Sequence, residues 1–324
     1  MTSPAISPAD LTSAADRIKG AVIRTPLVRS DALDERTGGR VFLKAECLQL
    51  TGSFKFRGAY NRLNALDETE REAGVVAFSS GNHAQGVARA AKLLGVPTAI
   101  VMPADAPKLK VDRTRRDGAE IILYDRMNES REEIATALAA ERGAVLVPSF
   151  DDPFIVAGQG TAGLEAREQL AELGAEADMA VVCCGGGGLS SGIATALPKA
   201  EMLLAEPAGY DDAGRSMEAG EIIAVESPQP TIQDALQTFR ISPLTFGILS
   251  GRGARGVSVT DAEVKAAMRF AFRELKLVVE PGGAAALAAL LSGKVDCRGR
   301  TVMATLSGGN VDTETFSACL AEAD

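Results

Sequence analysis

The segment that decides the fold reads AVVCCGGGGLSSG and covers residues 180–192. Its first five residues form an apolar run of strand length, and the glycines that follow introduce a helix. Runs of this kind alternate with alanine-rich stretches along most of the chain, which predicts βαβ units and an α/β fold with buried parallel strands. The other predicted strands are residues 75–78, 98–102, 120–123, 144–147, 202–205 and 301–306, and helices are predicted over 128–142, over 161–173 and after the capping box at 260–263.

Length and composition limit the architecture and exclude several classes of partner. With 324 residues, 46% of them hydrophobic, the chain can bury two linked cores, so we expect two domains. The net charge of −9 is spread along the chain without a basic patch, so neither nucleic acid nor a membrane is an expected partner. The chain has no apolar run of ~18 residues and no signal pattern, which predicts a cytoplasmic protein. The five cysteines never show a CxxC spacing and are predicted to be reduced, mostly buried thiols.

The four glycines from Gly185 to Gly188 predict an anion site. They stand between a strand and a helix, so unhindered backbone N–H groups and the positive helix N-terminus converge there. The segment is not a dinucleotide fingerprint, which requires glycine where Ser191 stands, and it lacks the Gly-Lys pair of a Walker loop. The alternative is a tight βα turn without a ligand. Two further turns after predicted strands, SSGNHAQG at 79–86 and SGGN at 307–310, lie at the edge where open parallel sheets bind ligands.

Lys55 is the candidate nucleophile of the chain. It lies in TGSFKFRGA, residues 51–59, between two phenylalanines and close to Arg57, a setting in which desolvation and a neighbouring cation lower the pKa of an amine. The alternative is an ordinary lysine at a helix start whose amine reaches solvent. His83, the single histidine, does not complete a Ser-His-Asp hydrolase, because no nucleophile elbow surrounds Ser79 and Ser80. A packing or capping role for His83 is at least as consistent with the sequence.

The acidic turn AEPAGYDD, residues 205–212, is a candidate metal site. Carboxylate and carbonyl oxygens at such short spacing can hold Mg²⁺ or Ca²⁺. By spacing alone, a solvated acidic turn is the more common outcome.

Six motifs stand in order along nearly the whole chain: SFKFRGA at 53–59, SSGNHAQG at 79–86, AGQGT at 157–161, GGGGL at 185–189, EPGGAA at 280–285 and SGGNVD at 307–312. Together they resemble the threonine and serine dehydratases, fold type II pyridoxal-phosphate enzymes that include serine racemase and 3-hydroxyaspartate dehydratase. The resemblance implies a tryptophan synthase β-like fold with two open, twisted, mostly parallel-sheet domains and the cofactor between them. Residues 1–60 and 151–324 are expected to form the large cofactor-binding domain, and residues 61–150 the small domain. A homodimer is expected on the same ground.

The resemblance also implies how the cofactor is bound. Lys55 is expected to carry pyridoxal 5'-phosphate as a Schiff base, with Phe54 beside the pyridine ring. Asn82 is expected to donate to the phenolic oxygen, and Ser307 to face the pyridine nitrogen. The phosphate would be held by Gly185, Gly186, Gly187, Gly188 and Leu189, in agreement with the anion site inferred from the residues alone.

Substrate and metal sites follow from the same resemblance. Ser80 corresponds to the acid and base of the opposite face in racemases, and Arg131 is similar to an arginine near the substrate that favours an acidic side chain. A surface arginine paired at i,i+4 is an equal alternative for Arg131. The substrate carboxylate would be bound by Ser79, Ser80, Gly81, Asn82 and His83, and a divalent cation (Mg²⁺, Ca²⁺ or Mn²⁺) by Glu206, the carbonyl of Tyr210 and Asp212.

The expected reaction is the dehydration and deamination of a small β-hydroxy amino acid, L-threonine and/or L-serine, to a 2-keto acid and ammonia. The freed Lys55 amine would remove the α-proton, and the cofactor phosphate would supply the proton with which the hydroxyl leaves. A serine racemase with side elimination activity and a 3-hydroxyaspartate dehydratase are the alternatives. The stretch 148–151 is more similar to threonine dehydratases than to racemases, whereas Ala235 replaces a common glycine and leaves the substrate open. A non-catalytic sensor is disfavoured because Lys55, Ser80 and the glycine loop occur together, and AEPAGYDD argues against a sulfhydrylase-like synthase.

Overall fold

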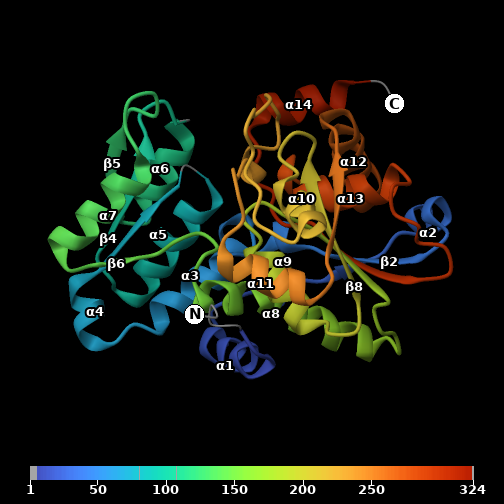
Figure 1. Cartoon of the computed structure of the whole chain (residues 1–324), viewed down its shortest axis with the longest axis horizontal. Coiled ribbons are helices and arrows are strands. Elements are labelled where there is room, and N and C mark those ends of the chain that lie inside the picture. Colours follow the sequence, from blue (N-terminus) through green and yellow to red (C-terminus); the bar gives the residue numbers. More distant parts are fainter. Residues whose placement is uncertain (1–5, 80, 107, 323–324) are drawn as a thin grey trace.

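Two α/β domains lie side by side in the computed structural model, which describes residues 6–79, 81–106 and 108–322 (Figure 1). The larger domain contains a six-stranded sheet in the order β1-β2-β10-β7-β8-β9. Neighbouring strands are parallel except for β1 and β2, which pair antiparallel. The strands are β1 (Leu27–Val28), β2 (Arg40–Lys44), β7 (Met179–Cys183), β8 (Glu201–Pro207), β9 (Arg255–Val259) and β10 (Thr301–Thr305).

The smaller domain contains a four-stranded, fully parallel sheet in the order β5-β4-β3-β6. Every residue of β7 in the larger sheet is buried, and so are five of the six residues of the central strand β4 here. Strands without polar alternation are covered by helices on both faces, as the sequence predicts. The α/β prediction is confirmed, and the division of the chain at residues 60 and 150 stays a prediction. The strands are β3 (Val75–Phe78), β4 (Thr98–Pro103), β5 (Glu120–Tyr124) and β6 (Val145–Leu146).

Helices cover both sheets and connect the two domains. Among them, the 20-residue α8 (Pro153–Glu172) is capped by Asp152, whose side chain accepts a hydrogen bond from the Ile155 N–H. Its glycines allow close contacts: a Cβ on Gly160 would lie 2.9 Å from the Cα of Gly192 in α9. The other helices are α1 (Pro8–Ile18), α2 (Asp31–Thr37), α3 (Lys55–Asn64), α4 (Glu68–Ala73), α5 (Asn82–Leu94), α6 (Lys108–Arg116), α7 (Arg131–Arg142), α9 (Gly188–Ala196), α10 (Asp212–Ala219), α11 (Pro243–Gly251), α12 (Asp261–Leu275), α13 (Ala285–Leu291) and α14 (Thr313–Ala321), with 3₁₀ turns η1 (Glu46–Leu48), η2 (Leu50–Gly52), η3 (Asp234–Leu236) and η4 (Gly282–Ala284).

Each domain has its own hydrophobic core. The larger one contains Phe42, Val181 and Leu204, and the smaller one contains Val87 and Ile100. Burying a side chain of this size contributes about 1.5–3 kcal/mol before the loss of chain entropy is counted. All five cysteines are buried and unpaired, as the sequence predicts. Over residues 6–79, 81–106 and 108–322, no helix combines the length and hydropathy that crossing a bilayer would require.

Several element boundaries differ from the sequence predictions. The strands β1, β2 and β9 were not predicted, because the first is only two residues long, the second has only three apolar residues between two charged ones, and the third begins with arginine and glycine. α7 begins at Arg131 and not at residue 128, since Ser130 caps it. α8 begins at Pro153, eight residues before the predicted start: Gly158 and Gly160 weaken the helix signal, whereas packing against α3 and α9 stabilises the helix there.

Candidate active site

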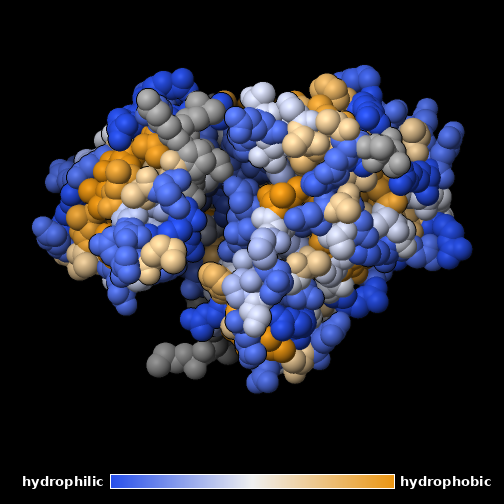
Figure 2. Space-filling model, turned by 90° about the horizontal axis from the view of Figure 1, so that it is seen from above, coloured by the Kyte–Doolittle hydropathy of each residue, from blue (hydrophilic) through white to orange (hydrophobic). Residues whose placement is uncertain are grey.

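The candidate site lies where the carboxyl ends of β7 and β10 meet the N-termini of α3, α5 and α9. Two residues after the end of β10, the carbonyl of Ser307 accepts a hydrogen bond at 3.1 Å from the N–H of Phe54, the residue before α3. α5 lies close to α3, since a Cβ on Gly86 would stand 3.1 Å from the backbone carbon of Lys55. Seen from above, the surface is hollowed between the two domains (Figure 2). The three turns predicted to bind ligands therefore meet between the two sheets.

Lys55 is the first residue of α3, and its side chain ends inside this site. Its Nζ donates a hydrogen bond to the carbonyl oxygen of Ser149 at 2.9 Å. Desolvation lowers the pKa of Lys55 to about 8, against smaller opposing effects from Cys183 and Glu280. An amine with this pKa is partly deprotonated at mildly alkaline pH, so it can serve as a nucleophile and as a base.

The glycine loop before α9 has the geometry of an anion site. Gly187 has a φ of 85°, in the left-handed region, and is the N-cap of α9. A Cβ on Gly186 would lie 2.2 Å from the ring of Phe150, and a Cβ on Gly187 would lie 2.9 Å from Thr245. In the described part of the chain no side chain caps α9, so the N–H groups of its first turn lack a side-chain acceptor there, at the positive end of the helix dipole. These features fit a phosphate group better than a ligand-free turn.

Asn82, the first residue of α5, is held at both ends of its side-chain amide. Its Nδ2 donates to Glu280 Oε1 at 2.6 Å, and its Oδ1 accepts from Asn310 Nδ2 at 2.8 Å. The second N–H of the Asn82 amide therefore has a defined direction and can donate to a ligand oxygen. The sequence analysis placed Glu280 and Asn310 in motifs but did not predict their contacts with Asn82, which lies 198 and 228 residues away along the chain.

Ser307 and Phe54 are grouped with Lys55 at the end of β10. The centre of the Phe54 ring lies 5.1 Å from Lys55 Nζ. Ser307 is buried beside the thiol of Cys183, which accepts a hydrogen bond from the hydroxyl of Thr305 at 3.7 Å. Burial raises the pKa of Cys183, so this thiol stays protonated. The site thus combines an amine, a hydroxyl and an aromatic ring next to the glycine loop.

The loop between β3 and α5 and the first two residues of α5 contain the residues predicted to bind the substrate carboxylate. The N–H of Gly81 donates to Ser79 Oγ at 3.1 Å. His83 Nε2 lies 2.9 Å from the carbonyl oxygen of Val147, and burial, followed by the charge of Lys55, lowers the pKa of His83 to about 3. A neutral ring that donates to a backbone carbonyl fits the packing role considered for His83 from the sequence. Ser80, the predicted acid and base of the opposite face, lies outside the described residues.

Arg131 is the first residue of α7 and lies beside this loop. Its guanidinium stands 5.6 Å from the centre of the ring of Phe78, the residue directly before Ser79. Its Nε donates to Glu132 at 3.0 Å, and 43% of the Arg131 side chain is exposed. The ion pair is therefore formed with the next residue and not at the i,i+4 spacing. An exposed pair of this kind contributes about 0–1 kcal/mol, so another anion can readily displace Glu132.

Glu206 and Asp212 form a buried acid pair, in contrast to the solvated turn that was the more common alternative. Glu206 accepts hydrogen bonds from the N–H groups of Ala213 and Gly214, both at 2.8 Å. Burial and the nearby Asp212 raise the pKa of Glu206 well above its ordinary value, and burial raises the pKa of Asp212 to about 7. Asp212 Oδ2 is buried and lacks a partner within the described ranges.

These two carboxylates, with the carbonyl of the buried Tyr210, are the groups that this turn offers to the predicted cation. Over the described residues, no group of three or more His, Cys, Asp or Glu side chains could hold a metal ion. An orphaned carboxylate oxygen beside a second carboxylate nevertheless fits a divalent cation, which would neutralise their repulsion.

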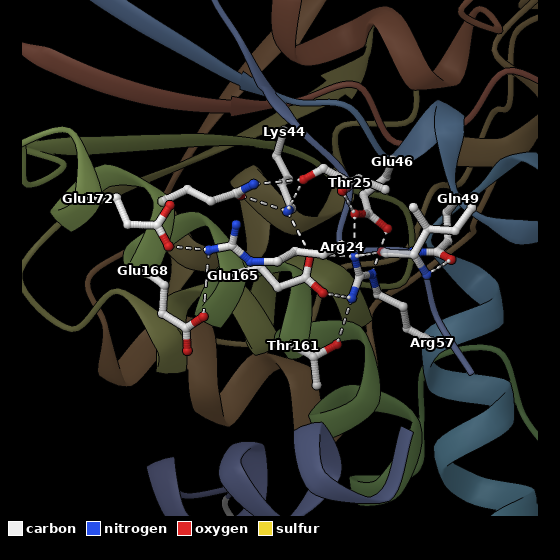
Figure 3. A network of polar contacts seen from close by, with 12 residues as sticks. Arg24, Thr25, Lys44, Glu46, Gln49, Arg57, Thr161, Glu165, Glu168 and Glu172 are labelled. Carbon is white, nitrogen blue, oxygen red and sulfur yellow. Dashed lines mark hydrogen bonds and ion pairs between the residues drawn. The ribbon is translucent and has the colours of Figure 1, made fainter. Parts of the chain in front are cut away.

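A buried ion network surrounds the side chain of Arg57 in α3 and was missed from the sequence. Arg57 donates to Glu46 and to both oxygens of Glu165, and Lys44 donates to Glu165 at 2.7 Å (Figure 3). Arg57 is not among the causes of the Lys55 pKa shift, so the expected effect of a neighbouring cation was wrong. The network joins β2, η1, α3 and α8. Two cations and two anions balance one another there, which stabilises charges that would be costly to bury alone.

A lysine of lowered pKa, a helix N-terminus behind a glycine loop and a buried hydroxyl at the sheet edge are the groups that an α/β enzyme would use to bind a phosphorylated aldehyde cofactor. The chain belongs to the threonine and serine dehydratase family of fold type II pyridoxal-phosphate enzymes, and the family model described as "Pyridoxal-phosphate dependent enzyme" matches residues 18–308. The family resemblance, the fold type and the cofactor expected from the sequence are thereby confirmed.

The relatives agree on the family and differ in the reaction that their names state. An L-threo-3-hydroxyaspartate ammonia-lyase of a Pseudomonas species is 46% identical and covers 96% of this chain and 97% of its own length. The structure of maize serine racemase has a TM-score of 0.91 with 38% identity, over 97% of each chain. The structure of a threonine deaminase from T.th. has a TM-score of 0.88 with 44% identity, over 95% of this chain and 99% of its own. The substrate is therefore not determined by similarity alone.

Proposed function

We propose that the protein removes water from a small β-hydroxy amino acid and releases a 2-keto acid and ammonia, with Lys55 as the residue that binds pyridoxal phosphate. The observation that carries the proposal is the Lys55 amine, with a pKa of about 8, in one site with the uncapped N-terminus of α9, Asn82 and Ser307. Each group has the chemistry that one part of the cofactor requires.

The residues present fit the cofactor. The N–H groups from Gly185 to Leu189 would hold the phosphate, the oriented amide of Asn82 would donate to the phenolic oxygen, and the Ser307 hydroxyl would face the ring nitrogen. When bound, pyridoxal phosphate supplies an electron sink for the charge that removal of the α-proton leaves behind.

The chain's own groups then carry the proton and orient the substrate. The amine of Lys55 accepts the α-proton, for which a pKa near the working pH is favourable. The N–H groups and hydroxyls of the loop from Ser79 to His83 bind the substrate carboxylate. A hydroxyl at Ser307, in place of a carboxylate, leaves the ring nitrogen less positive, which favours elimination over transamination.

L-Threonine and L-serine are the first substrates to test, and 3-hydroxyaspartate is a second candidate favoured by Arg131. Its guanidinium lies over Phe78 at the substrate loop, and its exposed pairing with Glu132 is weak enough to give way to a substrate β-carboxylate. The L-threo-3-hydroxyaspartate ammonia-lyase at 46% identity supports this candidate. Racemization of serine is the third outcome and depends on Ser80.

The test is a product assay on the purified protein with added pyridoxal phosphate. L-serine, L-threonine and L-threo-3-hydroxyaspartate are supplied separately, and 2-keto acid, ammonia and D-amino acid are measured. Equal amounts of keto acid and ammonia from at least one substrate are expected. A protein that binds the cofactor yet forms neither keto acid nor D-isomer from any of them would instead be a sensor.

We also propose a divalent cation bound by Glu206, the carbonyl of Tyr210 and Asp212, and a homodimer in solution. The cation is supported by the orphaned Oδ2 of Asp212 and the raised pKa of both acids. The dimer rests on the family resemblance, and light scattering during gel filtration measures it directly.

A further inference from the structure

Gln159 is a fully buried glutamine of α8 that lies between the lysine helix and the glycine loop. Two glycines make room for its side chain. A Cβ on Gly58 of α3 would stand 3.0 Å from Gln159 Cγ, and a Cβ on Gly188 of α9 would stand 2.6 Å from Gln159 Oε1. Any larger residue at either position would displace the glutamine, so the packing on both sides is built around it.

The amide of Gln159 shares an acceptor with the catalytic amine. Its Nε2 donates to the carbonyl oxygen of Ser149 at 3.2 Å, and the same oxygen accepts from Lys55 Nζ at 2.9 Å. A carbonyl oxygen has two lone pairs, so it can accept both donors.

Only one orientation of the Gln159 side-chain amide allows a hydrogen bond to the carbonyl of Ser149. If nitrogen and oxygen exchanged places, the amide oxygen of Gln159 would face the carbonyl oxygen of Ser149 without a proton between them. In the observed orientation, Oε1 is buried, has no partner within the described ranges and lies against Gly188. The hydrogen bond from Gln159 Nε2 to the Ser149 carbonyl therefore offsets the cost of leaving Gln159 Oε1 unpaired.

We propose that Gln159 is a positioning residue for Lys55: it holds the Ser149 carbonyl as the resting place of the Lys55 amine whenever that amine is not bonded to the cofactor. The inference rests on the proposed function of Lys55. An amine anchored through one N–H keeps its lone pair within a narrow range of directions, which is what proton removal from a bound substrate requires. Gln159 acts through Ser149 and through Lys55 and need not touch the substrate.

Two substitutions at Gln159 test separately the loss of the hydrogen-bond donor and the introduction of a negative charge. Gln159→Met keeps the approximate volume and removes the donor. Gln159→Glu keeps the shape but replaces the donor with a carboxylate close to the Lys55 amine, and an opposite charge stabilises the ammonium form. Among the described residues, the other titratable groups that act on the amine are Glu280, Cys183 and His83, and all three are unchanged in both variants.

Gln169→Met provides a matched control on the same helix. Gln169 is also buried, donates to the carbonyl of Thr25 at 2.9 Å and accepts from Lys44 Nζ at 2.9 Å. It therefore has the same side chain, a comparable burial and the same kind of donor bond to a backbone carbonyl, but its amide oxygen is paired and it lies in the ion network and not beside Lys55.

The experiment uses apoprotein recombined with pyridoxal phosphate, followed by steady-state kinetics. The rate of appearance of the visible band of the lysine-bound cofactor is measured against pH for each protein. We expect the pH at half-maximal rate to rise by about one unit or more in Gln159→Glu and to remain at the wild-type value in Gln169→Met. In Gln159→Met, kcat should fall roughly tenfold to hundredfold, with KM changed much less.

Two results would overturn the inference. One is a Gln159→Met protein whose kcat matches that of Gln169→Met at equal thermal stability, and the other is an unshifted recombination profile in Gln159→Glu. The recombination rates require no turnover. If the wild-type protein binds the cofactor but acts on no hydroxy amino acid, the proposed function is refuted. The recombination rates would still measure the role of Gln159 at Lys55.

Discussion

The acid pair of Glu206 and Asp212 makes the stability of the protein depend on pH and on divalent cations in a way that can be worked out from the structure. The pKa of Asp212 is about 7 in the folded protein, against 3.8 for an ordinary aspartate. Because folding favours the protonated form, the stability that this group contributes is fully present below about pH 3.8 and is lost as the pH rises through about 7. Three pKa units correspond to about 4 kcal/mol over the whole range, and the interval from pH 5.5 to pH 7 accounts for about 2 kcal/mol of it, which solvent screening reduces to roughly 1–2 kcal/mol.

The perturbation is Asp212→Asn, with Asp211→Asn as the matched control. Asp211 is the neighbouring acid, but its side chain is 37% exposed and pairs with Arg215 at the surface. Thermal unfolding is followed in a metal chelator at pH 5.5 and pH 8. Between these two values the wild type and Asp211→Asn should lose several degrees of melting temperature, roughly 3–6 °C for a chain of this size, beyond any loss in Asp212→Asn.

Adding Mg²⁺, Ca²⁺ or Mn²⁺ at pH 8 should restore the melting temperature of the wild type and of Asp211→Asn, because a bound cation stabilises the ionised pair. Asp212→Asn should respond little. If Asp212→Asn and the wild type lose equal stability between pH 5.5 and pH 8 in the chelator, the reasoning from the buried acid is refuted. If the cations stabilise all three proteins equally, the cation does not bind at this pair.

Three further substitutions test other parts of the structure. Arg57→Met leaves the buried carboxylate of Glu46 without its cation and should lower the free energy of unfolding by about 3–5 kcal/mol, measured by denaturant titration; a loss below about 1 kcal/mol would contradict the ion network. Arg131→Ala should raise KM for 3-hydroxyaspartate by about tenfold and leave KM for L-serine within about twofold. An equal change in KM for both substrates would contradict a contact between Arg131 and the β-carboxylate. Gly186→Ala, whose Cβ would stand 2.2 Å from a phenylalanine ring, should weaken pyridoxal phosphate binding at least about tenfold, whereas Gly247→Ala, which meets open space, should not; equilibrium dialysis measures both, and equal affinities would count against the phosphate site.

The sequence predicts those parts of the site that depend on residues only a few positions apart along the chain. Consecutive glycines between an apolar strand and a helix can be read directly, and residues 185–188 indeed lie at the N-terminus of α9. The aromatic neighbour of Lys55 is local in the same sense, since the ring of Phe54 lies 5.1 Å from the Lys55 Nζ. These features depend on residues within a few positions of one another, so a single sequence contains them.

The parts that sequence reasoning missed depend on contacts across the fold. Glu280 fixes Asn82 from 198 residues away, and Arg57 pairs with Glu165 from 108 residues away. Arg57 was read as a neighbour of Lys55 because it is close in sequence, whereas its guanidinium is held by Glu46 and Glu165 on other elements. Hydrophobic periodicity predicts which elements form but not which polar side chains face each other, so such pairs become visible only in the folded chain.

The most direct test of the central claim is to find the residue that carries the cofactor. The protein loaded with pyridoxal phosphate is reduced with borohydride, digested and mapped by mass spectrometry. The account predicts a stable phosphopyridoxyl group on Lys55 alone, and no such modification in Lys55→Ala treated in the same way. Modification of a different lysine, or an unmodified Lys55 in protein that retains the cofactor, would contradict it.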